Sequence, residues 1–511
     1  MRKMKVLLVR SPRYYWPFIN EYDNFLLPQS LPCLAAALRA SGISVKVIDC
    51  MPMKMGWKSL ENQIKIEKPD VVGVGDSESM YSNEAVRVLK IARMLNPQVV
   101  TVAGGAHFSN LAHESLKEFP IDFIVKGEGE ITFVELVKEI SKLNPDFNSV
   151  NGILFRQEDV IIETAPRKLI ENLDDLPLPA YDLMPMDQYG RAKYLFSPGG
   201  ITIHHSRGCI SNCDFCVWWV QMAEKTIENG EVKLTPRWRT KSVERTIEEI
   251  ELLYYTYKKK FFIFVDDSWN IDPDWSNRFA EAILEKKMKI NWFAFLRADC
   301  IIRDEKLGVM EKLVRSGLRH ISVGGERAED DELNEIGKKC YKIDMVKEAL
   351  DIFRKKYPQV FTQVTFIVGV RNETKKTMMN QLAYAKSLKV DYPAFHPITP
   401  VPGTKLWDQA KAEGWLEITD FSYYDWSTPV MASKDLSRDQ IDDLLYTINK
   451  SYASFWWLLK GLCSLYPHKR NMYIWWVLVV FKMFWDSLKS WVNPFKFKEY
   501  IRIVKPKWYD D

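Results

Sequence analysis

The sequence predicts an α/β protein in which two successive strand-helix units precede a helical C-terminal region. In the first part of the chain, short runs of β-branched residues alternate with stretches of helical periodicity. A second series of strands and helices begins at Gly200, and the last part of the chain is helical in pattern and rich in tryptophan and phenylalanine. The 511 residues suffice for two or three domains, each with its own core.

The first unit, residues 1–145, is expected to form a doubly wound parallel sheet. Its apolar runs are continuous rather than alternating, which is typical of strands buried on both faces. Strands are expected at residues 6–9, 45–48, 71–74, 99–102 and 123–125, and helices at 33–40, 60–67, 82–95 and 112–119. In such a sheet, ligands lie beyond the carboxyl ends of the strands.

Glycine-rich loops follow the fourth and fifth expected strands. The first contains Gly104 and Gly105, and the second contains Gly127, Glu128 and Gly129. Because glycine has no Cβ atom, these positions let the backbone approach a bulky ligand closely. Tight turns are an alternative explanation for the same glycines.

The next segment, residues 146–195, is expected to be a linker because it is rich in proline and acidic residues, notably at 173–179. The second unit, residues 196–412, carries six strand-helix repeats. Its strands are expected at 201–204, 261–265, 291–295, 320–323, 362–368 and 392–398, and its helices at 242–257, 276–287, 305–316, 343–355 and 375–387. Six repeats fit a partial TIM barrel, in which chemistry gathers at the carboxyl ends of the strands.

Three cysteines, Cys209, Cys213 and Cys216, follow the first barrel strand within eight residues. Three thiolates can hold three corners of an iron-sulfur cluster and leave one iron open, whereas a structural zinc site takes four protein ligands. A zinc knuckle completed by His204 or His205 is the alternative.

Further polar or glycine motifs follow the other barrel strands. Asp266 and Asp267 follow the second strand, where paired carboxylates would orient a substrate or relay protons, or else cap a helix. Arg297, Glu326 and Gly369 follow the third, fourth and fifth strands. Each alone is compatible with a turn or cap.

The CxxxCxxC spacing, with Phe215 directly before the third cysteine, resembles the signature of the radical S-adenosylmethionine (radical SAM) superfamily. The resemblance implies a 4Fe-4S cluster whose open iron binds S-adenosylmethionine and whose reduction yields a 5'-deoxyadenosyl radical. It also implies roles for four residues. Arg297 would lie near the carboxylate of S-adenosylmethionine, Glu326 would bind its ribose hydroxyls or amino group, Gly369 would meet the adenine or ribose, and Phe215 would shield the cluster or face the adenine.

The unit before the barrel resembles the Rossmann-like cobalamin-binding domain of cobalamin-dependent radical SAM proteins, through residues 72–76, 102–107 and 125–130. The resemblance implies cobalamin contacts at Gly104, Gly105, Gly127, Glu128 and Gly129. The motif DxHxxG is absent, because residues 49–53 contain no histidine. The lower face of cobalt would therefore be unligated or met by another group, such as Cys50 or Met51, for which core packing is the alternative.

The C-terminal region, residues 413–511, is expected to be an α-helical extension rich in aromatic residues. Its most apolar span, 472–485, is shorter than the roughly 20 residues that a bilayer requires. Lysines 460, 469, 482, 489, 496 and 498 lie near Trp and Phe, a pattern that suits an interfacial helix in peripheral membrane contact or an apolar substrate wall. Packing against the barrel is the alternative.

Composition limits the partners. The net charge is only +4 and no basic stripe is present before the C-terminal fifth, so nucleic acid is not expected as a partner. Only three of the eight cysteines cluster, and the N-terminus lacks a signal-peptide pattern. A cytoplasmic location is expected, with membrane association left open.

The layout most resembles the subgroup of anaerobic magnesium-protoporphyrin IX monomethyl ester oxidative cyclases, including residues 420–424 and 428–431. The resemblance implies hydrogen abstraction from an unactivated carbon of a large apolar substrate, a tetrapyrrole or lipid, followed by oxidation or cyclisation. The electron donor would be a flavodoxin or ferredoxin. The alternatives are a radical C-methyltransferase acting on a lipid, and a non-catalytic cluster-bearing sensor or scaffold at a membrane surface.

Overall fold

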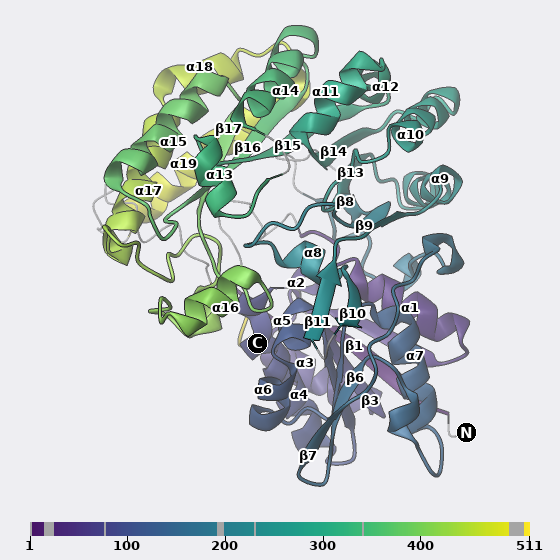
Figure 1. Cartoon of the computed structure of the whole chain (residues 1–511). Coiled ribbons are helices and arrows are strands. Elements are labelled where there is room, and N and C mark those ends of the chain that lie inside the picture. The colour runs from purple at the N-terminus through teal and green to yellow at the C-terminus, as the bar shows by residue number, and fades with distance from the viewer. Residues whose placement is uncertain are drawn as a thin grey trace.

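The computed structural model describes residues 3–14, 25–75, 78–191, 199–228, 231–339, 342–489 and 505–511. Two sheets, each covered by helices, stack one above the other, with the N-terminal sheet domain in the lower half of Figure 1 and the barrel in the upper half. The expected fold class, an α/β protein with a doubly wound first domain and a partial barrel, is confirmed.

The N-terminal sheet has seven strands in the order β2-β1-β3-β4-β5-β6-β7. The first five strands are parallel: β1 (Lys5–Arg10), β2 (Ser44–Asp49), β3 (Val71–Gly75), β4 (Val100–Gly104) and β5 (Phe123–Val125). The last two, β6 (Ile153–Gln157) and β7 (Val160–Glu163), are antiparallel. This hairpin lies in the segment expected to be a linker, so the sheet continues beyond residue 145.

Helices cover both faces of this sheet because side chains alternate along each strand. In β1, Val6 and Leu8 join one core, whereas Leu7 and Val9 join another. The helices are α1 (Ser30–Ala40), α2 (Cys50–Met53), α3 (Trp57–Glu67), α4 (Ser82–Leu95), α5 (Ala106–Asn110), α6 (Ala112–Glu118) and α7 (Gly129–Ile140). Of these, α2, α5 and α7 were not expected, although α7 begins at Gly129, which was singled out as a ligand contact.

The second sheet has six parallel strands in the order β17-β16-β15-β14-β13-β8. The strands are β8 (Gly200–Ile203), β13 (Phe261–Phe264), β14 (Asn291–Leu296), β15 (Leu318–Glu326), β16 (Phe361–Val368) and β17 (Tyr392–Pro397). Two small antiparallel pairs accompany them, β9 (Ser206–Gly208) with β12 (Trp238–Thr240), and β10 (Glu224–Glu228) with β11 (Glu231–Thr235). The six expected barrel strands are thus all present.

The barrel helices are α8 (Val217–Gln221), α9 (Val243–Glu251), α10 (Pro273–Glu285), α11 (Ala298–Lys306), α12 (Val309–Arg315), α13 (Asp330–Glu335), α14 (Ile343–Lys356), α15 (Lys375–Leu388) and α16 (Lys405–Ala412). The single helix expected at 305–316 is wrong. The structure has α11 and α12 there, separated at Gly308, which has a φ of 71°. A left-handed residue ends one helix and caps the next, and glycine adopts this conformation without strain.

The C-terminal helices are α17 (Arg438–Tyr452), α18 (Phe455–Leu462) and α19 (Pro467–Lys489). One face of α19 packs on the barrel, since Met472, Tyr473 and Trp475 form a core cluster with Phe361. None of the helices in the described ranges has both the length and the apolarity to span a bilayer. Trp491, Lys496 and Lys498, part of the predicted aromatic and basic segment, lie outside the described residues.

Candidate active site between the two sheets

The three cysteines lie on one loop that joins β9 to α8 at the carboxyl edge of the barrel. Cys209 Sγ lies 3.3 Å from Ser268 Oγ and accepts a hydrogen bond from the Ser211 N–H at 3.4 Å. The Trp219 Nε1–H donates to the Cys213 carbonyl at 3.0 Å. Cys216 is the residue that precedes α8. The strand end and the short helix therefore hold the loop at both ends.

The donor set of this loop fits an iron-sulfur cluster. All three cysteines are reduced, and burial raises the pKa of Cys216 to about 12. Three thiols on one short loop match the ligand set of such a cluster. In the zinc alternative, His204 or His205 would be the fourth ligand, and both side chains are buried. His205 instead stacks on Trp275 at 4.0 Å between ring centroids.

The two aspartates support the segment that leads into the cysteine loop. Asp266 is buried, and its Oδ1 accepts from the N–H groups of His205 and Ser206 at 3.0 and 2.6 Å and lies 2.8 Å from His205 Nδ1. Asp267 accepts from the Gly208 N–H at 3.2 Å, and burial, followed by the Asp266 charge, raises its pKa to about 7. The helix-cap alternative is wrong for both, because Asp272 caps α10.

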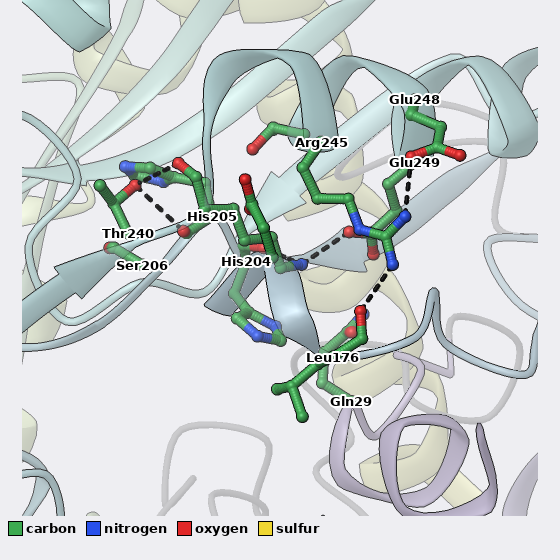
Figure 2. A network of polar contacts seen from close by, with 12 residues as sticks. Gln29, Leu176, His204, His205, Ser206, Thr240, Arg245, Glu248 and Glu249 are labelled. Carbon is green, nitrogen blue, oxygen red and sulfur yellow. Dashed lines mark hydrogen bonds and ion pairs between the residues drawn. The ribbon is translucent and has the colours of Figure 1, made fainter. Parts of the chain in front are cut away.

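Buried polar contacts continue along the same segment (Figure 2). Lys241 Nζ donates to the His204 carbonyl at 2.8 Å and to Glu249 Oε2 at 2.6 Å, and Thr240 Oγ1 donates to the His205 carbonyl at 3.2 Å. Neither His204 nor His205 is exposed. The two histidines are thus part of the scaffold beneath the loop.

Arg297 connects the third barrel strand to the cysteine loop. Its Nη1 donates to Ser211 Oγ at 2.6 Å, while Nε and Nη2 donate to the Asp299 carboxylate at 3.1 and 2.8 Å. Since Ser211 lies between Cys209 and Cys213, Arg297 lies beside the cysteine loop. Its role at the carboxylate of S-adenosylmethionine stays a prediction.

Glu326 and Gly369 lie at the ends of the fourth and fifth barrel strands and have left-handed backbones, with φ values of 57° and 73°. Glu326 is buried and pairs with Lys338 at 2.9 Å. The Gly369 N–H donates to Glu373 at 3.0 Å. Phe215 packs beside Ile336, Val370, Ile398 and Met431, so it lies between the cysteine loop and the strand ends.

Sequence reasoning missed the ion pair between Arg327 and Glu373. Arg327 Nη1 donates to Glu373 Oε2 at 2.6 Å, and both residues are fully buried. The pair links the ends of β15 and β16. A signal was available, since Arg327 directly follows Glu326 and Glu373 follows Gly369 by four residues.

Apolar side chains line the inner wall of the barrel along β13 and β14. Phe261, Ile263 and Phe293 form a cluster on the inner face, whereas the alternate residues Phe264 and Trp292 join the outer core. By this alternation, Val265 and Phe295 also face inward, and they are 40% and 39% exposed. Large apolar side chains are therefore accessible inside the barrel mouth.

The loops of the N-terminal sheet offer backbone rather than side chains. Gly105 and Gly127 have φ values of 87° and 71°, and a Cβ atom added at Gly127 would meet nothing within 4 Å. This open, left-handed backbone fits the close approach of a large cofactor. Gly129 differs, because its added Cβ would lie 2.9 Å from Leu34, which indicates packing between helices.

The sequence predicted that Glu128 contacts cobalamin, but in the structure its side chain is not open to a ligand. Its carboxylate is buried and accepts from Arg207, Arg239 and the Ile170 N–H. Cys50 and Met51 are also buried in the two cores, which favours packing over a role near cobalt.

The two carboxyl edges face each other. Ala106, which follows the Gly104–Gly105 turn, packs with Val217 of α8 and Val401 of the barrel. Asn110 Nδ2 donates to the Pro402 carbonyl at 2.8 Å. The helix that follows the cysteine loop is therefore in direct contact with the loop after β4.

Comparisons with known proteins agree with this geometry. A B12 binding domain model matches residues 15–137, and a radical SAM superfamily model matches residues 203–384. An uncharacterized methyltransferase of Pyrococcus horikoshii is 33% identical over 89% of this chain and 93% of its own length. The anaerobic magnesium-protoporphyrin IX monomethyl ester cyclase of Rubrivivax gelatinosus is 28% identical over 88% of this chain and 79% of its own length.

Among solved structures, the radical S-adenosylmethionine methyltransferase TsrM from Kitasatospora setae, with cobalamin and a [4Fe-4S] cluster bound, matches with a TM-score of 0.70. It is 17% identical, and the match covers 94% of this chain and 99% of that one, so it shows a shared fold. The predicted cofactors, a 4Fe-4S cluster, S-adenosylmethionine and cobalamin, are confirmed by the two matching domain models. The chain belongs to the cobalamin-dependent radical SAM enzymes, with a B12-binding domain in front of a radical SAM barrel.

Proposed function

We propose that this enzyme takes a hydrogen atom from an unactivated carbon of a large apolar substrate bound in the barrel mouth. The observation that carries the proposal is the accessible apolar wall of Val265 and Phe295, at the edge where the cysteine loop faces the N-terminal domain. An apolar substrate would bury these side chains and exclude water from the reacting carbon.

The residues around the mouth have separate proposed roles. When bound, the cluster and S-adenosylmethionine supply a carbon radical, and cobalamin supplies a methyl group or an electron acceptor. Cys209, Cys213 and Cys216 would hold the cluster. Arg297, already directed at the cysteine loop, would orient the carboxylate of S-adenosylmethionine.

Glu326, Gly369 and Phe215 would form the rest of the S-adenosylmethionine site. Glu326 lies at the end of β15 beside Lys338, where a carboxylate would accept from ribose hydroxyls or an amino group. The backbone of Gly104, Gly105 and Gly127 would border cobalamin. Asp266 and Asp267 are proposed to position the cysteine loop, and a proton relay through Asp267 would require the substrate to reach it.

Two outcomes follow hydrogen abstraction, and we favour methylation of the substrate carbon. The Pyrococcus horikoshii relative, at 33% identity, is named a methyltransferase. Oxidation with ring closure, the outcome placed first from the sequence alone, is the second candidate because the Rubrivivax gelatinosus relative is named a cyclase.

Mass spectrometry separates the two outcomes. The reconstituted enzyme is incubated without oxygen with a reductant, methyl-deuterated S-adenosylmethionine and either lipid extract or porphyrin esters. Methylation adds one labelled methyl group to a substrate, whereas oxidation or cyclisation removes hydrogen without adding label. A reduced enzyme that forms no 5'-deoxyadenosine with any extract contradicts the enzymatic proposal and favours the sensor or scaffold alternative.

We also propose a flavodoxin or ferredoxin as electron donor, because one-electron reduction of the cluster needs an external reductant. A donor that supports 5'-deoxyadenosine formation in place of dithionite would satisfy this proposal.

Peripheral contact with a membrane is a further proposal. Phe455, Trp456 and Phe481 on α18 and α19 are 70%, 74% and 68% exposed, and Lys460 is exposed beside them. Aromatic and basic side chains together suit the interface of an anionic membrane. Lys469 does not contribute, since it pairs with Asp391 at 2.8 Å.

Flotation with phosphatidylglycerol vesicles tests this contact. W456S/F481S should lose vesicle binding, while L143S, which changes a fully exposed leucine on the other domain, should retain it. Equal binding of both variants contradicts the assignment of the surface.

A further inference from the structure

Four buried charged residues join the N-terminal domain to the segment that leads into the cysteine loop. On the N-terminal domain they lie beside the loop that contains Gly127, which we call the cobalamin-side loop. Glu128 and Glu130 come from the start of α7, and Arg207 and Arg239 come from the paired strands β9 and β12. We call these four residues the interdomain quartet. Arg207 and Arg239 are directly opposite each other in the strand register.

Arg207 connects both glutamates through its two terminal nitrogens. Its Nη1 lies 2.6 Å from Glu128 Oε1, and its Nη2 lies 2.6 Å from Glu130 Oε1. Arg239 Nη1 lies 2.9 Å from Glu128 Oε2 and also donates to the Ile170 carbonyl. The forked guanidinium is therefore the shared member of the quartet, and a single ammonium group could not reproduce its geometry.

The chain between Arg207 and Cys209 leaves little room for independent motion. Gly208 has a φ of 88°, and an added Cβ would lie 2.1 Å from the Arg237 carbonyl oxygen. Its N–H also donates to Asp267 at 3.2 Å. A displacement of Arg207 would consequently be passed to Cys209.

Glu128, at the other end of the quartet, is directly bonded in the chain to the cobalamin-side loop, which contains Gly127. Gly127 directly precedes Glu128, and Glu128 in turn is the residue before α7. The quartet contains two acids and two bases, and all four side chains are at most 11% exposed. Burial alone would raise the pKa of Glu128, but Arg207 and Arg239 hold it below its ordinary value. Removal of one charge would therefore leave a buried charge of opposite sign without its full set of partners.

We propose that Arg207 is a positioning residue that fixes the Cys209 end of the cluster loop relative to the Gly127 loop. Because the quartet joins the two loops, a ligand that fixes the conformation of one loop also restricts the other. S-adenosylmethionine and cobalamin therefore each strengthen the binding of the other. This inference rests on the two cofactor sites and does not depend on which reaction follows.

Hydrogen exchange tests the linkage in protein without cobalamin. E130Q, on the N-terminal domain, should raise exchange in residues 206–213 of the barrel, and R207Q should raise exchange in residues 127–134. The control R237Q removes an exposed arginine that pairs with Glu171 and Glu224, and it should change neither segment. If E130Q and R207Q raise exchange only beside their own positions, the linkage is overturned.

Cobalamin affinity provides the second readout. In the wild type, a non-cleavable analogue of S-adenosylmethionine should tighten hydroxocobalamin binding about fivefold, a typical linkage between sites. R207Q should abolish this gain, and R207K should restore less than half of it. A gain that persists in R207Q refutes the proposal. If R207Q does not fold, E130Q decides the outcome, because it leaves Arg207 paired with Glu128.

Discussion

The cysteine loop and the loops after β4 and β5 lie at the facing carboxyl edges of the two sheets, yet the first depends on side chains and the others depend on backbone. The cysteine loop depends on side chains: three thiols, Asp266 below them and Arg297 beside them. The loops after β4 and β5 depend on backbone, with left-handed Gly105 and Gly127 and a carboxylate, Glu128, turned away into an ion network. One sheet thus offers thiol side chains at its carboxyl edge, and the other offers open backbone.

Removal of a thiol should have the largest effect and would sharpen this comparison. C209A, C213A and C216A should each lose cluster iron and reduce cleavage of S-adenosylmethionine to background, because each thiolate holds one corner of the cluster. Iron content, absorbance and 5'-deoxyadenosine report the loss. C463A, which changes an exposed cysteine outside the loop, is the control. A loop-cysteine variant with normal iron content would break the comparison.

Asp266 should be the next most sensitive position, since it accepts hydrogen bonds from two backbone N–H groups of the segment that leads into the cysteine loop. D266A would leave the buried N–H groups of His205 and Ser206 without an acceptor, at a cost of about 3 kcal/mol in unfolding free energy. Denaturant unfolding of the cluster-free protein measures this cost. D266N keeps an acceptor oxygen and should lose less. Equal losses in both variants would assign the effect to charge rather than to the backbone donors.

His107, in the N-terminal domain, should make the free energy of unfolding depend on pH. His107 in α5 is buried, packs against Phe108 and Phe421, and lies 3.0 Å from Ser79 Oγ. Burial lowers its pKa to about 4 from the ordinary 6.5. The unfolded chain therefore takes up a proton first on acidification. The neutral, buried His107 therefore contributes about 3 kcal/mol to the free energy of unfolding above pH 6.5. This contribution is lost as the pH falls from 6.5 towards 4.

The thermal midpoint of the wild type and of H107Q, followed between pH 7 and 4, measures this contribution. The glutamine variant should lose less stability than the wild type over the same interval. Parallel curves for the two proteins would show that His107 does not titrate in this range.

A substitution at Gly127 should have the smallest effect and tests the role of the backbone. G127A places a side chain in the left-handed region at a cost of about 1–2 kcal/mol, without a clash in the described structure. Cobalamin affinity should fall roughly tenfold, while cluster content stays normal. G414A carries similar strain two residues after α16, at a φ of 68°, and should leave cobalamin affinity unchanged.

Much of the fold could be read from local patterns. Most parallel strands of the two sheets are short apolar runs that are largely buried, and β5, β8 and β13 are buried throughout. Helix α4 has the bounds that periodicity predicted. The hairpin of β6 and β7 was missed although each strand carries a short apolar run, at residues 153–155 and 160–162, because the proline and acidic residues of the surrounding segment led to the linker prediction. The split between α11 and α12 depends on the conformation of one residue, Gly308.

The sequence by itself determined the chemistry of the cysteine loop, because the three thiol ligands lie within eight consecutive residues and few other kinds of protein site use cysteines at this spacing. Only the tertiary structure decided which way Glu128 points, that Asp266 supports backbone rather than a helix, and that Arg207 joins the two domains. These roles arise from contacts between residues more than 55 positions apart in the chain. A buried carboxylate is directed by its partners, and no local pattern shows which distant arginine or amide will meet it.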